Sequence, residues 1–149
     1  AGLAAAGVWQ PGQLVMHTAA RFGYSVLVPA LAAGAIPLAV HPAMSFTGTS
    51  MDLVRLRDAY CAVTAPTPVL PIGQALVVEM GAEPLVIAEA DRAAYAEAVS
   101  IATSFSSAIV GQAVGVLADL GVDDAARVLG PLIRSSVENA LAAALPPAG

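Results

Sequence analysis

Two histidines, His17 and His41, are the side chains in this sequence best placed to do acid–base chemistry. Each ends a short uncharged run, "LVMH" and "LAVH", and each is followed by a residue typical of a turn, Thr18 and Pro42. An imidazole titrates near neutral pH, so it can exchange a proton with a substrate or donate to a carboxylate or carbonyl. The alternative is that each ring only caps its strand by bonding to backbone. The pair alone does not have the spacing of a metal site.

A second set of polar side chains recurs at helical spacing further along the chain. The residues are Ser100, Thr103, Ser104 and Ser107. Positions i, i+3, i+4 and i+7 share one face of a helix, so they form a polar stripe on an otherwise apolar element. A buried stripe must find hydrogen-bond partners in a neighbouring helix, water or ligand. Both a ligand site and helix–helix contact through small residues fit this pattern.

The elements that would position the histidines follow an α/β pattern. Residues 13–17 and 35–41 are apolar runs typical of buried strands, and residues 21–34 between them suit a helix closed by Gly34. The alternation continues through a short helix in "MDLVRLRDA", a strand in "YCAVTAP", a helix in "PIGQALVVEMG" and a strand in "EPLVIA". Apolar strands joined by helices indicate a parallel sheet. Its carboxyl edge would then carry both histidines, where ligands bind in open α/β sheets.

The pattern changes at residue 89. From there to residue 120 nothing stops a helix, and a second helix is expected from 124 to 145 with a bend at Pro131. The sequence therefore predicts an α/β domain over residues 1–88 followed by an all-α domain over residues 89–149. Helices this apolar need cover on most sides, which implies a partner subunit or further sequence. Because the chain begins without Met, we expect a fragment.

Composition excludes several classes of protein. The net charge is −5 and the six basic residues are scattered, so nucleic-acid binding is not expected. With 58% hydrophobic residues, mean hydropathy is +0.77, and two uncharged stretches (22–51 and 98–118) are long enough to cross a membrane. Prolines interrupt the first and hydroxyl side chains recur in the second, so buried helices are expected instead.

The single cysteine, Cys61, excludes an internal disulfide and a multi-cysteine metal site. Its place in an apolar strand predicts a packed core thiol, with a reactive thiol as the alternative. A lone cysteine suits a reducing compartment, and we expect a cytoplasmic protein.

The stretch "LVMHTAARFGYSVLVPALAAGAIPLAVHPAMSF" resembles an uncharacterised family of two-domain oxidoreductases related to ketopantoate reductase and 6-phosphogluconate dehydrogenase. In that family one strand ends in His-Thr, and the next ends in His-Pro followed by an apolar residue and Ser-Phe. Here these are His17-Thr18, His41-Pro42 and Ser45-Phe46. The resemblance continues through "MGAEPLVI", an Asp-Arg-x-x-Tyr helix start at residues 91–95, and "PLIRSSVENA".

The resemblance implies the C-terminal part of a Rossmann-like sheet, followed by a C-terminal helical domain like that of 6-phosphogluconate dehydrogenase. It also implies NADP(H) as cofactor and the reduction of a small 2-keto acid such as ketopantoate, a step of pantothenate biosynthesis. A homodimer through the helical domain is implied as well. Catalysis would fall to His41 and His17, and the cofactor would lie against Thr18 and Pro42. The substrate-binding residues would be Ser45, Tyr95, Ser100, Thr103, Ser104 and Asn139, with Glu138 beside the last of them.

Three departures from the family pattern keep other interpretations open. Tyr95 is followed by Ala96 where the family has His, and Thr103-Ser104 stands where it has Ser-Asn. The G-x-G-x-x-G phosphate-binding turn is absent from the sequence and is expected before residue 1. "HPAMSFTG" also looks like the His-Pro-Met-Ala-Gly segment of prephenate and arogenate dehydrogenases, although Ser45-Phe46 fits the first family better. A dimerisation module without catalytic activity is the third interpretation.

Overall fold

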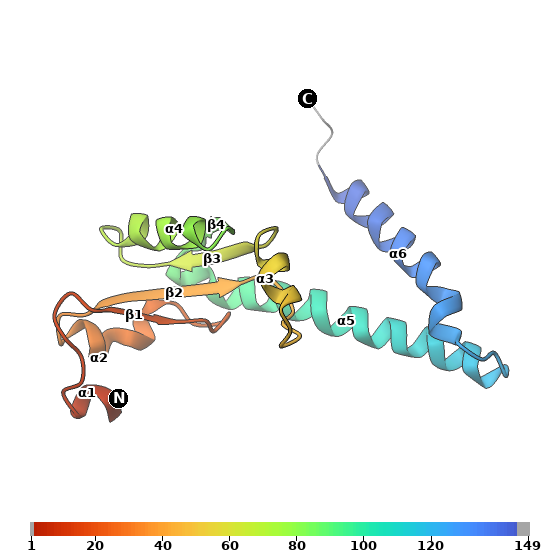
Figure 1. Cartoon of the computed structure of the whole chain (residues 1–149), viewed down its shortest axis with the longest axis horizontal. Helices are drawn as coiled ribbons and strands as arrows, with labels where there is room; N and C mark the ends of the chain where they lie inside the picture. Colours follow the sequence, from red (N-terminus) through yellow and green to blue (C-terminus); the bar gives the residue numbers. More distant parts are fainter. Residues whose placement is uncertain (1, 146–149) are drawn as a thin grey trace. The chain divides into compact units, whose positions relative to one another are not determined.

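The computed structural model describes residues 2–145 and divides the chain into two compact units, one up to Val99 and one from Ser100 onward (Figure 1). The first unit contains a sheet with flanking helices, and the second consists of two helices. This is the predicted order of an α/β region followed by an all-α region. The division falls after the first turns of the long helix, because side chains of those turns pack on the sheet unit, as described below.

The sheet unit begins with a short helix and ends in the long one. Its elements are α1 (Gly2–Ala5), β1 (Leu14–His17), η1 (Tyr24–Leu27), α2 (Val28–Leu31), β2 (Ile36–Pro42), α3 (Met51–Leu56), β3 (Tyr60–Thr64), α4 (Leu70–Glu79), β4 (Glu83–Val86), η2 (Glu89–Asp91) and the start of α5 (Arg92–Asp119). The predicted strands all form. The helix expected over residues 21–34 is shorter, since only residues 24–31 are helical, as η1 and α2.

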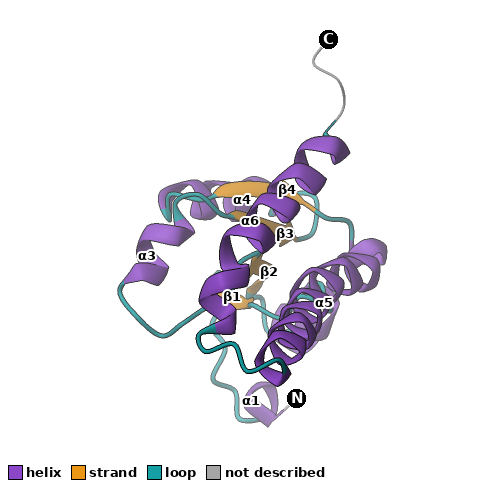
Figure 2. Ribbon diagram, turned by 90° about the vertical axis from the view of Figure 1, so that its right-hand side faces the viewer, coloured by secondary structure: helices purple, strands orange, loops and turns teal. Residues whose placement is uncertain are grey.

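The four strands lie side by side in the order β1-β2-β3-β4 (Figure 2). β1 pairs with β2 in parallel and β3 with β4 in parallel, but β2 and β3 run antiparallel, with Val40 opposite Val63. The expectation of a wholly parallel sheet was therefore wrong at one pair. A parallel connection must cross a face of the sheet, usually with a helix. The connection from β2 to β3 contains only the six-residue α3, where Leu53 and Val54 stay exposed, so the chain turns back beside β2.

Helix α4 covers one face of the sheet. Its Val77 packs with Leu38, Val40 and Val63 in a cluster whose members are fully buried. Close approach depends on Gly73, because a Cβ there would lie 2.8 Å from Val63 Cγ1. The buried Cys61 belongs to the same cluster, and burial raises the pKa of its thiol. It is thus the packed core thiol that its sequence context predicted.

Alternate residues of the strands face the other side of the sheet. There Val15 packs with Ala30 of α2 and with Ala35. Because Leu38 and Val40 face α4, the alternation of side chains along β2 turns Ala39 and His41 to this second face. Register places Ala39 beside His17 on β1. The two histidines therefore lie on adjacent strands at the carboxyl ends of β1 and β2, as the sequence predicted.

The loop after β2 is closed by a carboxylate. Asp52, which is 8% exposed, accepts hydrogen bonds from the backbone N–H groups of Thr47 and Gly48 and from the Thr47 hydroxyl. Burial opposes ionisation, but the hydrogen bonds from Thr47, Gly48 and Thr49 outweigh it and lower the pKa of Asp52. This network orders the segment that carries Ser45 and Phe46.

The second unit consists of the remainder of α5 and of α6 (Ala125–Ala144), with Pro131 inside the latter. Large apolar side chains are exposed along both helices: Phe105, Ile109, Val116, Leu120, Val128, Leu132, Val137 and Leu141. By length and composition, residues 89–119 form one helix that could cross a membrane. One such helix is weak evidence for a membrane protein, since a helix covered by other protein meets the same criteria.

Candidate functional site

His17, at the end of β1, has both ring nitrogens bonded to nearby backbone. Its Nδ1 accepts from the N–H of Ala19 (3.2 Å), and its Nε2 lies 2.8 Å from the carbonyl oxygen of Gly23. An accepting Nδ1 leaves the proton on Nε2, which donates to Gly23. The ring closes the loop between β1 and η1, which is the capping arrangement that the sequence left open as the alternative.

His41, at the end of β2, instead contacts a side chain from a distant part of the sequence. Its Nδ1 lies 2.8 Å from the hydroxyl oxygen of Tyr95, in the first turn of α5. The two rings meet edge to face, with centroids 5.5 Å apart. Both side chains are half-buried, and no other hydrogen bond to His41 is found among the described residues. The predicted catalytic residue His41 and the predicted substrate-binding residue Tyr95 thus form one pair.

Beneath this pair lies a buried cation, Arg92, which is only 1% exposed. Its guanidinium donates to three carbonyl oxygens, at 2.9 Å to Phe22, 2.7 Å to Ala19 and 3.4 Å to Ala62. The guanidinium carbon also lies 5.6 Å from the centre of the Tyr95 ring, within the range of a cation–π contact. Arg92 therefore ties the start of α5 to the loop after β1 and to β3.

Glu89, three residues before Arg92, holds the other end of the same loop. Its two carboxylate oxygens accept the backbone N–H groups of Tyr24 (3.0 Å) and Ser25 (3.2 Å). Gly23 makes room for this contact, because a Cβ there would overlap the Glu89 carboxylate. The N–H groups that begin η1 are thus occupied by a carboxylate of the chain itself. They cannot serve as the phosphate-binding helix terminus of a dinucleotide fold.

The surroundings keep the His41–Tyr95 pair neutral near pH 7. Burial, and then the charge of Arg92, lower the pKa of His41 below its ordinary 6.5. Burial raises the pKa of Tyr95, although Arg92 opposes this. Because the pKa of His41 is lower in the folded state than in the unfolded chain, its contribution to stability is complete above pH 6.5. It is lost as the pH falls below that value.

The other residues predicted at the sheet edge lie near these side chains in sequence but make fewer contacts. Thr18 is exposed directly after β1, Pro42 is buried at the end of β2, and Ser45 is exposed in the loop that follows. Their proximity to a cofactor or substrate stays a prediction.

The residues predicted to bind substrate from the helical region belong to the second unit, apart from Tyr95. Ser100, Thr103, Ser104 and Asn139 are exposed, and so is Glu138. The Thr103 hydroxyl donates to the carbonyl of Ser100, and Ser107 donates to that of Thr103. Part of the hydroxyl stripe is thus satisfied by carbonyls of its own helix. The part of these residues in substrate binding stays a prediction.

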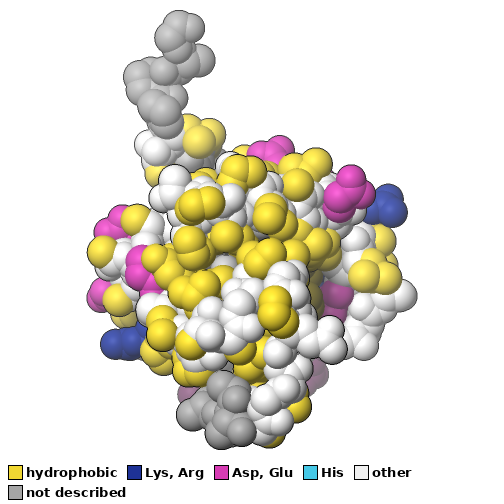
Figure 3. Space-filling model, turned by 90° about the vertical axis from the view of Figure 1, so that its left-hand side faces the viewer, with side chains coloured by type: hydrophobic (Ala, Val, Ile, Leu, Met, Phe, Trp, Pro, Cys, Tyr) yellow, Lys and Arg dark blue, Asp and Glu magenta, His cyan; other side chains and the backbone are white. Residues whose placement is uncertain are grey.

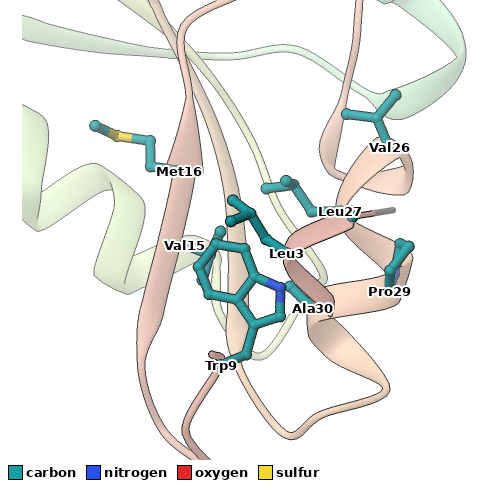
Figure 4. A pocket seen from close by; sticks show the side chains of 9 residues that line it. Leu3, Trp9, Val15, Met16, Val26, Leu27, Pro29 and Ala30 are labelled. Atoms are coloured by element: carbon teal, nitrogen blue, oxygen red, sulfur yellow. The ribbon is translucent and has the colours of Figure 1, made fainter. Parts of the chain in front are cut away.

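A cavity of about 530 Å³ lies between α1, β1 and α2, and no titratable side chain lines it. Trp9 faces it together with Leu3, Leu27 and Ala30 (Figure 4). Hydrophobic side chains gather over this end of the sheet unit (Figure 3). Since acid–base chemistry needs ionisable groups, we place the candidate site at the His41–Tyr95 pair and not in this cavity. Within residues 2–145 no group of three His, Cys, Asp or Glu side chains could hold a metal ion.

Glu89→Gln should loosen the loop after β1 without unfolding the protein. A neutral amide is a weaker acceptor than a carboxylate for the two N–H groups, and we expect a loss of about 1 kcal/mol in stability. Faster amide hydrogen exchange at Tyr24 and Ser25 would show this locally. Glu97→Gln, at an exposed position of α5, is the matched control. Equal exchange rates in both variants would contradict the assignment.

Arg92 and Glu89 are the residues that our sequence interpretation missed as parts of the site. Both make contacts across more than sixty residues of sequence, which no local pattern reveals. One signal was available: Glu89, Arg92 and Tyr95 recur every three residues at a helix start. The chain has only six basic residues, and Arg92 shares a helix face with Tyr95, a predicted site residue. This was a reason to include Arg92 among the candidate site residues.

Comparison with known proteins supports this architecture. A family model described as a domain of unknown function, DUF2520, matches residues 59–148, and a model described as a Rossmann-like domain matches residues 1–42. No curated protein matches the chain. The crystal structure of protein TM1727 from Thermotoga maritima is similar, with a TM-score of 0.70 and 20% identity, over 85% of this chain and 48% of TM1727. The chain thus spans about half the length of TM1727, and the likeness supports the fold alone.

Proposed function

The chain belongs to the DUF2520 family, and from its Rossmann-like sheet edge we propose that its protein is an NADP(H)-dependent oxidoreductase. The substrate class proposed is a small 2-keto acid, with ketopantoate as the first to test, and the compartment is the cytoplasm. The single observation that carries the proposal is the His41–Tyr95 contact of 2.8 Å, at the edge of a Rossmann-like sheet where ligands bind. A neutral hydrogen-bonded pair of this kind is a proton source for carbonyl reduction.

The residues present suit only the nicotinamide end of such a cofactor. Thr18 and Pro42 follow the two strands and would lie against it. The turn after β1 has no glycine with a positive φ, and Glu89 occupies the N–H groups that follow, so the pyrophosphate would be held elsewhere. Bound NADPH would supply the hydride.

The proton chemistry falls to the residues of the pair. With a proton on Nδ1, His41 donates to the Tyr95 oxygen, which leaves the Tyr95 hydroxyl hydrogen directed to a substrate carbonyl oxygen. As that oxygen gains charge, Tyr95 transfers its proton to it and recovers one from Nδ1 of His41. In the same relay, as Nδ1 gives up its proton, Nε2 of the half-buried imidazole takes one from solvent, so the ring never carries a negative charge. The ring ends neutral as the other tautomer, so one proton has moved from solvent to product.

Fluorescence titration with NADPH tests the cofactor part of this proposal. We expect saturable binding by the full-length protein, followed by NADPH oxidation when ketopantoate is added. Oxidation of prephenate with NADP⁺ would instead favour the dehydrogenase interpretation. A protein that leaves NADPH fluorescence unchanged would favour the module without catalytic activity.

We also propose that the second unit forms a homodimer. The exposed apolar residues Phe105, Ile109 and Val116 are four or seven positions apart, so they line one stripe of α5, and exposed Leu120 follows directly after the helix. An exposed apolar stripe of this length is typical of an interface. Sedimentation equilibrium should give twice the monomer mass, and Ile109→Glu should shift the protein towards the monomer. Exposed Glu97→Gln is the control, and an unchanged dimer in Ile109→Glu would contradict this surface.

A further inference from the structure

We infer that Arg92 is a positioning residue for the proposed proton transfer: its buried guanidinium holds the loop after β1 and the Tyr95 ring so that the Tyr95 hydroxyl meets Nδ1 of His41. This inference rests on the proposed function for its effect on turnover, but its structural part stands on contacts within the sheet unit. Neither the family nor the resemblance assigns a task to this arginine.

Arg92 contacts three segments around the His41–Tyr95 pair: strand β3, the loop after β1 and the Tyr95 ring. Ala62, whose carbonyl accepts from Nη1, is the residue paired with His41 across β2 and β3. Ala19, whose carbonyl accepts from Nη2, donates its own N–H to the His17 ring. The same guanidinium lies against the face of Tyr95. One side chain thus fixes the strand beside His41, the loop beside His17 and the ring of Tyr95.

The charge of Arg92 is not paired with a carboxylate. Within residues 2–145 the only ion pair links Arg55 and Asp52 of α3, and both carboxylate oxygens of Glu89 accept hydrogen bonds from backbone N–H groups. Glu89 is near enough to act on the charge of Arg92, but the atoms that accept hydrogen bonds from the guanidinium are neutral carbonyl oxygens, so part of its field reaches the pair. That field favours neutral His41, and it also favours an anionic group, such as a substrate carboxylate, near the pair.

Lysine and methionine at position 92 separate the charge from the fixed geometry. Lysine keeps the charge but is not a planar fork, so it cannot hold three carbonyls in the same arrangement. Methionine fills similar space but removes both the positive charge and the hydrogen bonds to the three carbonyl oxygens. If Arg92 acts through geometry, both variants should lose turnover, by about tenfold to a hundredfold, because misplaced acid groups are inefficient. If its charge also acts on His41, only methionine should raise the pKa of that ring.

The titration of His41 gives a readout independent of activity. Arg92 is the charged group that acts on His41, and Arg92 and the Cys61 thiol, which lies across the sheet, act on Tyr95. Glu89 acts on Arg92. Nitrogen-15 NMR of the full-length protein, with His41 and His17 assigned through His→Gln variants, would follow each ring. Arg127→Met, exposed on α6, is the matched control.

We expect Arg92→Met to raise the pKa of His41 and to change the Nδ1 shift that reports the bond to Tyr95. Arg92→Lys should change the Nδ1 shift with a smaller effect on the pKa. If Arg92→Met fails to fold, Arg92→Lys decides alone. A wild-type Nδ1 shift and wild-type turnover in Arg92→Lys would overturn the inference. Altered His41 signals in a protein that turns over no 2-keto acid would support the geometry while refuting the proposed function.

Discussion

His41→Ala should lower kcat for 2-keto acid reduction by about a hundredfold to a thousandfold, the range expected when a general acid or base is removed. The imidazole is the group that restores the Tyr95 proton, and without it the phenol must recover its proton from water inside a half-buried site. The affinity for NADPH should stay within about twofold, because the ring contacts Tyr95 rather than the proposed cofactor edge. Stopped-flow measurement of NADPH oxidation separates the two quantities.

His41→Gln is the informative companion to this variant. An amide can accept or donate a hydrogen bond to Tyr95 but cannot carry a proton across the ring. It should therefore preserve the fold and the position of Tyr95 while turnover remains low. Wild-type turnover in either variant would remove His41 from the mechanism and leave it as the end of a strand.

Tyr95→Phe should lower kcat by about a hundredfold, because it removes the hydroxyl that faces the substrate and keeps the ring over Arg92. Stability should change little, since the hydroxyl is half-buried and its ring contacts remain. The double variant with His41→Ala should be little worse than the slower single variant, because residues that act as a unit are not additive. Measurement of kcat for the wild type, both single variants and the double variant gives this coupling.

Tyr24→Phe is the matched control for the tyrosine. Tyr24 is also half-buried and lies in the sheet unit, but its backbone N–H rather than its hydroxyl makes the contact to Glu89. Independent, multiplicative losses from His41→Ala and Tyr95→Phe would argue against a shared proton path.

The strands of the sheet could be predicted because the pattern that identifies each one lies within a few consecutive residues. Apolar runs bounded by turns identify the strands, and the two histidines follow from the ends of those runs, so their common edge could be inferred without coordinates. The direction of β3 could not be inferred from the sequence. It depends on whether residues 43–59 cross a face of the sheet, and that depends on where α3 packs. Leu53 and Val54 look like core residues in the sequence and are exposed in the structure.

The site was predictable only in part for a related reason. His41 and Tyr95 were both proposed, but their contact spans 54 residues and rests on Arg92, whose burial no composition rule would suggest. His17 shows the opposite case. The sequence left catalysis and strand capping open, and the ring makes two short-range backbone contacts that suit capping. In the mechanism proposed above, His17 therefore holds the loop, and His41 handles the proton.

The most direct test of the central claim is the absorbance of NADPH mixed with the full-length protein and ketopantoate. We expect a steady, protein-dependent loss of NADPH that slows at least a hundredfold in His41→Ala. A protein that binds NADPH and consumes it with ketopantoate equally fast in the wild type and in His41→Ala would contradict the assignment of the pair. Failure to consume NADPH with any 2-keto acid tested would contradict the proposed reaction.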